Sequence, residues 1–154
     1  MRCKRNLDEQ YSTNRCIFDG TGNDKNNDVR INDGSLTNIG KLHEAYIGAD
    51  KFYVEGVGTR HLSNAEVELV QQGIADKNDY YDSSAMAFGT GVKDKVNTMI
   101  TNVKSFIANN PDSEVVIDVF GFSRGSTEAR DFIKKRGQMI TITKSFINKI
   151  AKCN

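Results

Sequence analysis

The residues best suited to chemistry are a serine and its neighbours at 121–125, Gly-Phe-Ser-Arg-Gly. This run matches G-x-S-x-G, the pattern of a nucleophile elbow, in which a sharp strand-to-helix turn exposes a serine hydroxyl above a sheet. Gly121 and Gly125 would remove the side chains that collide in so tight a turn. We therefore predict Ser123 as a nucleophile. The alternative is a purely structural glycine turn.

The flanks of this motif supply the context that the pattern needs. Residues 115–120, Val-Val-Ile-Asp-Val-Phe, are rich in β-branched types and predict a strand. Residues 126–135 predict a helix. In such a turn the backbone N–H of Arg124 points to where a tetrahedral oxyanion forms, and the helix N-terminus adds partial positive charge there.

An oxyanion hole needs a second donor, which in this type of site comes from the loop after an earlier strand. Residues 15–19, Arg-Cys-Ile-Phe-Asp, predict a short buried strand, with Cys16 as a small core residue. Gly20-Thr21-Gly22 follows directly, and its glycines let the backbone approach a ligand closely. The alternative is an ordinary strand-ending turn.

The remaining chain has to build the elements that position these loops. The pattern predicts helices over 35–48 and 92–109, a strand over 51–54, and mostly loop over 60–90 with a short helix near 64–72. Residues 140–152 fit a strand or a helix. Strands that alternate with helices favour a mostly parallel sheet covered by helices, an α/β fold. We expect a polar lead over 1–14 and one domain over 15–154.

Composition excludes several classes of protein. The formal net charge is +1, which gives no reason to expect nucleic acid as a partner. Three cysteines without C-x-x-C spacing disfavour a zinc ribbon or a disulfide scaffold. We expect no metal, because Cys/His clusters are lacking and the acidic stretch 23–33 lacks a calcium-loop pattern and is interpreted as a solvated loop.

Nucleotide and phosphate chemistry have equally little support, and we expect no cofactor. No phosphate-binding loop of the G-x-x-x-x-G-K type occurs, and a phosphatase-like D-x-D-G-T motif would need an aspartate where Ile17 stands. No run approaches the roughly 18 apolar residues of a membrane helix, and no secretory signal is visible. We expect a cytoplasmic protein that, if exported, leaves without a cleavable signal peptide.

Three segments together resemble one known family. They are Ile-Phe-Asp-Gly-Thr-Gly-Asn at 17–23, Tyr-Val-Glu-Gly-Val-Gly-Thr at 53–59 and Phe-Gly-Phe-Ser-Arg-Gly at 120–125. They are similar to the signatures of an α/β-hydrolase family, long catalogued as a domain of unknown function, that includes phospholipase effectors of bacterial type VI secretion, first lipase class. The resemblance covers roughly residues 15–135.

The resemblance implies a three-layer α/β-hydrolase-like sheet with helices on both faces and serine-centred ester hydrolysis, in some members on membrane phospholipids. Carried onto this chain, Ser123 is the nucleophile, Arg124 lends its amide, and Asp19, Gly20 and Thr21 form the loop beside them. A partner from the secretion apparatus, or an immunity protein, is implied by the resemblance alone.

One departure concerns the general base. The family places a histidine and an acidic partner after the serine, but the two histidines of this chain, His43 and His61, both precede it. We therefore expect a C-terminally truncated hydrolase domain. His61 is a candidate base, against an exposed loop histidine, and Asp131 a candidate acid, against a surface helix charge. Because a serine without a base is a poor nucleophile, the rival interpretation is a non-catalytic remnant or binding module.

Overall fold

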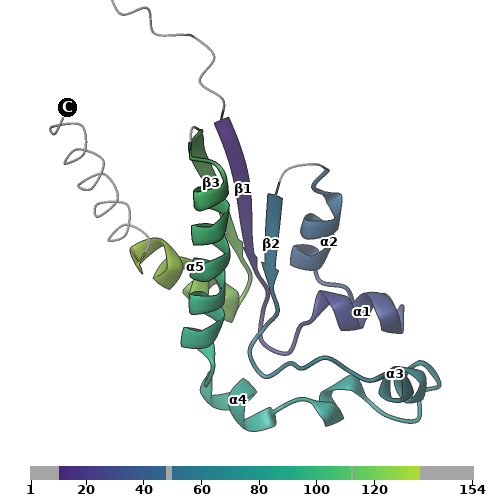
Figure 1. The fold of residues 1–154 in the computed structure, drawn as a ribbon. Helices are drawn as coiled ribbons and strands as arrows, with labels where there is room; N and C mark the ends of the chain where they lie inside the picture. The colour runs from purple at the N-terminus through teal and green to yellow at the C-terminus, as the bar shows by residue number, and fades with distance from the viewer. Residues whose placement is uncertain (1–10, 48–49, 112, 136–154) are drawn as a thin grey trace, which may run out of the picture.

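A computed structural model describes residues 11–47, 50–111 and 113–135. Three parallel strands form a sheet in the order β2-β1-β3, from β1 (Tyr11–Phe18), β2 (Asp50–Val54) and β3 (Glu114–Gly121). The central strand β1 pairs with both neighbours, so that Cys16 lies opposite Phe52 on one side and Val119 on the other. The predicted α/β class is confirmed (Figure 1).

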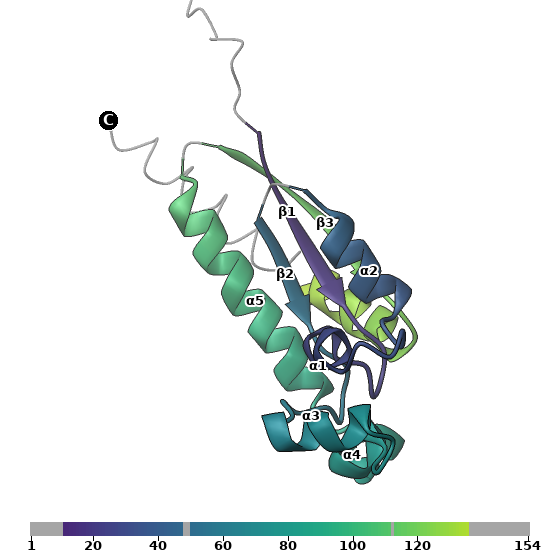
Figure 2. The same ribbon diagram turned by 90° about the vertical axis from the view of Figure 1, so that its right-hand side faces the viewer.

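Helices cover both faces of this sheet. The long helix α5 (Val92–Asn109) lies on one face, and α2 (Asn38–Ala45) lies on the other (Figure 2). A further helix over 124–135 follows β3 directly and packs on the α5 side, where the rings of Phe18 and Phe132 are 5.8 Å apart. The predicted helix over 92–109 is confirmed residue for residue, because its apolar stripe has a clear helical period.

Alternation along the strands explains how the sheet is sandwiched. Cys16 and Phe18 of β1 point into a core shared with α5, whereas Arg15 points to the opposite face and lies 4.1 Å from the ring of Tyr46, just after α2. The core on the α5 side consists of apolar side chains from two strands and two helices: Cys16, Phe18, Val54, Val96, Met99, Val103, Ala129 and Phe132.

A second, smaller core lies beyond the carboxyl ends of the strands. Here α1 (Lys25–Ile31), α3 (Asn64–Gln71), the 3-10 helix η1 (Lys77–Tyr80) and α4 (Ser83–Phe88) form a layer that Figure 1 shows at the foot of the sheet. Its buried members are Ile31, Leu62, Val67 and Tyr81. This layer surrounds the loops that follow β1 and β2.

The start of the first strand and the nature of the stretch 23–33 were predicted wrongly. The strand predicted from residue 15 begins at Tyr11, so residues 11–14 of the expected polar lead belong to the sheet. The stretch 23–33 is not a solvated loop but contains α1, whose N-cap Asp24 and whose Asn27 and Asp28 are buried. These polar side chains are tolerated inside because they bond to one another and to the backbone, as in the 3.0 Å bond from Asn27 Nδ2 to Asp24 Oδ2.

Three other expectations need correction or stay open. The region 60–90 contains α4 and η1 in addition to the short helix that was predicted. The helix predicted from 126 already begins at 124. The predicted element over 140–152 lies outside the described residues. None of the helices that the structure describes has the length and apolarity needed to cross a bilayer.

Candidate functional site

Ser123 occupies a strained turn between β3 and the helix over 124–135. Its φ is +52°, in the left-handed region that non-glycine residues rarely adopt. Two backbone bonds hold the turn: the N–H of Phe122 donates to Phe18 O (3.2 Å), and the N–H of Ser126 donates to Ser123 O (3.0 Å). Ser123 is exposed to solvent. A strained, exposed serine at a strand-to-helix turn is the geometry of a nucleophile elbow.

The two glycines of the motif are sterically required. A Cβ on Gly125 would lie 2.5 Å from the carbonyl oxygens of both Phe18 and Asp19, and one on Gly121 would lie 2.5 Å from Gly125 O. The turn therefore packs directly on the end of β1. This contact brings the nucleophile motif against the loop that follows β1.

That loop lies beside Ser123. A Cβ built on Gly20 would be 3.2 Å from Ser123 Cβ, and one on Gly56 would be 1.7 Å from Gly20 O. The loop is also bonded to the segment after β2, because the N–H of Gly22 donates to Val57 O (3.1 Å). All three segments that resemble the family signatures thus meet at the carboxyl ends of neighbouring parallel strands.

Two backbone amides in this cluster are available to a ligand. The N–H of Gly20 is committed to Asp19 Oδ1 at 2.8 Å. The N–H of Thr21 makes no hydrogen bond to any of the described residues, and neither does the N–H of Arg124, which begins the helix and has no intrahelical partner. Of these two loop amides, only that of Thr21 is without a hydrogen bond to the described residues.

Asp19 is a buried support of the loop after β1. It is buried, and its Oδ2 accepts from Thr37 Oγ1 and from the phenol of Tyr53, both at 2.8 Å. The phenol oxygen in turn accepts from the N–H of Lys25 at 2.9 Å. Burial, together with the nearby Asp19 carboxylate, raises the pKa of Tyr53, so the phenol stays a donor.

The side chain of Arg124 ties the elbow to α4. Its Nη1 donates to Met86 O, a carbonyl in the last turn of α4, and its guanidinium lies 3.6 Å from a Cβ built on Gly89. A cation at a helix C-terminus is stabilised by the orphan carbonyls and by the helix dipole. Arg124 thus has two separate roles, an available amide in the turn and a cap on a neighbouring helix.

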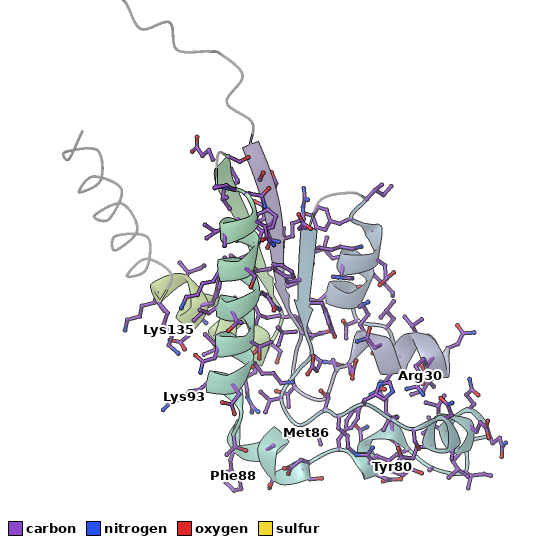
Figure 3. The ribbon with its side chains drawn as sticks, in the orientation of Figure 1. Arg30, Tyr80, Met86, Phe88, Lys93 and Lys135 are labelled. Carbon is purple, nitrogen blue, oxygen red and sulfur yellow. The ribbon has the colours of Figure 1, made fainter. Side chains whose placement is uncertain are left out.

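The structure does not bring His61 or Asp131 to Ser123. His61 is exposed, and its Nε2 lies 3.4 Å from Arg30 Nη1. Asp131 pairs with Lys135 at 3.0 Å, about 10 Å along the helix axis from the elbow at 1.5 Å per residue. Figure 3 shows Arg30 and Lys135 on opposite sides of the molecule. Among the described residues, the hydroxyl of Ser123 makes no side-chain hydrogen bond.

Sequence reasoning missed Glu128, one turn into the helix over 124–135. It is fully buried, and neither carboxylate oxygen has a hydrogen-bond partner among the described residues. Burial raises the pKa of Glu128 to about 7, although the charges of Lys95 and Arg124 oppose the shift. Its position was available from the sequence, because it stands four residues before Phe132 on the face that packs inward.

Within 11–47, 50–111 and 113–135, no three His, Cys, Asp or Glu side chains gather in a metal-binding arrangement.

Comparison with known proteins identifies a family for this chain. Residues 15–145 match the family described as "T6SS, Phospholipase effector Tle1-like, catalytic domain". Since this match covers most of the chain, the protein belongs to that family, as its three signature segments predicted. No match was found among curated proteins or among solved structures.

Proposed function

We propose that this domain hydrolyses carboxylic esters of phospholipids through an acyl-enzyme on Ser123. The observation that carries the proposal is the exposed Ser123 at φ +52°, with the unpaired amides of Thr21 and Arg124 in the segments packed around it. Membership in a phospholipase effector family supports a lipid ester as the substrate.

The proposed reaction has two steps. Ser123 Oγ attacks the acyl carbon, its proton passes to a base, and the carbonyl oxygen becomes an oxyanion that accepts from the N–H groups of Thr21 and Arg124. The tetrahedral intermediate then expels the alcohol, which takes up the proton, and leaves an acyl-serine that water hydrolyses. One oxyanion donor is typically worth about 3 kcal/mol of barrier.

Among the described residues, no histidine lies beside Ser123 to act as the general base. His43 contacts Glu44 and the ring of Tyr53, and His61 contacts Arg30, so neither lies on the serine. We propose that a histidine other than these two, from outside residues 1–154, completes the site. In its absence the oxyanion donors would leave only residual catalysis.

A fluorophosphonate probe tests the proposal on the whole 154-residue chain. We expect slow covalent labelling, detected as an intact-mass increase, that is lost in Ser123→Ala. Ser105→Ala serves as the matched control, because Ser105 is exposed on α5 and takes no part in the turn, so it should leave labelling unchanged. A folded chain that is not labelled, even at high probe concentration, would contradict activation of Ser123 and favour a non-catalytic binding module.

A second experiment separates the candidate bases. If His61 were the base, His61→Gln would abolish labelling as completely as Ser123→Ala. We expect His61→Gln to label at the rate of the unsubstituted chain, because its ring faces Arg30.

A further inference from the structure

A small hollow opens beside the nucleophile, on the α2 side of the loop after β1. Five residues line it, namely Asn23, Leu36, Thr37, Asn38 and Phe122, and its volume is about 290 Å³. We call it the α2 hollow.

The α2 hollow and Ser123 meet at Gly20. A Cβ built on Gly20 would touch Phe122 Cδ1 at 2.9 Å, Asn23 Nδ2 at 3.1 Å and Ser123 Cβ at 3.2 Å. Phe122 and Asn23, which line the hollow, and Ser123 therefore all lie close to the Cα of Gly20, which has no side chain to separate them. A group held in the hollow would lie next to a bond under attack by Ser123.

The walls of the α2 hollow offer uncharged polar groups. Thr37 Oγ1 is already committed, since it donates to Asp19 and accepts from the N–H of Gly40 at 2.9 Å. The Nδ2 of Asn23 donates to Thr21 O at 3.3 Å, which leaves its Oδ1 available. The carboxamide of Asn38 makes no hydrogen bond within the described part of the chain and can both donate and accept.

Size and polarity restrict the occupant. Ligand pockets commonly begin at about 300 Å³, so this hollow has room for a small group but not for a long acyl chain. Leu36 and Phe122 provide one apolar wall, while the two asparagines provide donors and acceptors but no charge. A compact, neutral group that carries oxygen atoms fits this lining better than a fatty acid tail or an anion.

We propose that the α2 hollow binds the glyceryl portion of the phospholipid, next to the ester that Ser123 attacks; this rests on the proposed function. Asn38 donates to and accepts from glyceryl oxygens, and Asn23 accepts from a glyceryl hydroxyl in the lysolipid product. The acyl chain lies outside the hollow. Since its walls are uncharged, the hollow does not distinguish between head groups by their charge.

The test uses the whole chain as Ser123→Ala, labelled with ¹⁵N, so that binding is measured without turnover. Titration with sn-glycero-3-phosphocholine should shift the side-chain amide signals of Asn23 and Asn38, whereas hexanoate should not. The anionic probe sn-glycero-3-phosphoglycerol should bind within about twofold of the zwitterion. Asn38→Leu should weaken binding of both glyceryl probes about fivefold, as expected for one lost hydrogen bond.

Asn97→Leu is the control, because Asn97 is an exposed asparagine on α5 that does not line the hollow. Amide spectra of both variants report whether the fold is retained. Shifts caused by hexanoate but not by the glyceryl probes would overturn the proposal in favour of an acyl pocket, and so would shifts from neither ligand. Probe labelling of the unsubstituted chain is measured separately. If Ser123 is labelled but the glyceryl probes cause no amide shifts, only this inference is overturned. If the glyceryl probes cause shifts but Ser123 is not labelled, the proposed hydrolysis is overturned.

Discussion

At the scale of single residues, the backbone conformation of Ser123 exposes its side chain but lowers the stability of the fold. A non-glycine residue in the left-handed region costs of the order of 1 kcal/mol relative to glycine. Because φ is +52° and the side chain makes no hydrogen bond among the described residues, nothing there offsets this cost.

We predict that Ser123→Gly raises the free energy of unfolding by about 1 kcal/mol while abolishing probe labelling. Urea denaturation measures the first effect and intact-mass analysis the second. Ser123→Ala is the comparison, since alanine keeps the strain and should leave the free energy of unfolding within about 0.5 kcal/mol. Equal stability of the glycine and alanine variants would show that the turn is not strained.

Asp19 is the residue that holds the loop after β1 in place. Its carboxylate accepts from Gly20 N, Thr37 Oγ1 and Tyr53 OH. We predict that Asp19→Ala lowers the free energy of unfolding by about 3 kcal/mol and slows labelling of Ser123, since one buried and two half-buried donors lose their acceptor. Tyr53→Phe removes one of these bonds and should cost about 1 kcal/mol, which denaturation of both variants would reveal. Equal losses would contradict the view that Asp19 is the centre of the network.

At the scale of elements, the helix over 124–135 buries an acid against α5. Glu128 has a pKa of about 7 in the folded chain, against 4.5 for an ordinary glutamate. Between these values the unfolded chain binds fewer protons than the folded chain. The free energy of unfolding must therefore fall as pH rises from about 4.5 and level off above about 7.

We predict that this one group lowers stability by roughly 2.5 kcal/mol between pH 5 and pH 8, with the steepest change near pH 6, midway between the two pKa values. Glu128→Gln removes the ionisation, so the variant should come closest to the unsubstituted chain at the acid end of this range and exceed it at pH 8. Glu68→Gln, at an exposed position on α3, is the control and should leave the pH profile unchanged. Parallel profiles for Glu128→Gln and the unsubstituted chain would disprove the shift.

How well the elements could be predicted depended on how they achieve burial. The helix α5 and the strand β3 bury apolar side chains at regular spacing, so their periods were visible in the sequence. The helix α1 buries Asn27 and Asp28 instead, and a polar stretch of this kind has the composition of a loop. Only the tertiary bonds of those side chains, to Arg60 O and Lys77 for example, make the helix stable.

Some parts of the candidate site could likewise be predicted from the sequence, and others could not. The strand-to-helix turn at Ser123 and its contact with the loop after β1 were predictable, because steric demands fix the glycines of both segments. The contacts of His61 were not, since they depend on long-range packing against Arg30.

At the scale of the whole molecule, the described residues have two cores with different tasks. One lies between the sheet and α5, and the other joins α1, α3 and α4 beyond the carboxyl ends of the strands. The second core positions the loops around Ser123, but it is smaller, and so we expect it to open more easily.

We predict that Leu62→Ala, at a fully buried position in the second core, costs about 2–5 kcal/mol locally. Amide hydrogen exchange should accelerate across α1, α3 and α4, while β1 and α5 keep most of their protection. Met99→Ala, equally buried in the first core, should accelerate exchange throughout the chain. If both variants raised exchange uniformly, the molecule would open as one cooperative unit.

The strained turn at Ser123 also bears on how this domain can change over generations. Screens that retain only the most thermally robust variants would favour glycine at position 123, because the backbone there prefers it. Lineages in which the serine persists must be held by a requirement for its hydroxyl. Serine at this position in related sequences would therefore indicate selection for the hydroxyl, and glycine would indicate selection for folding alone.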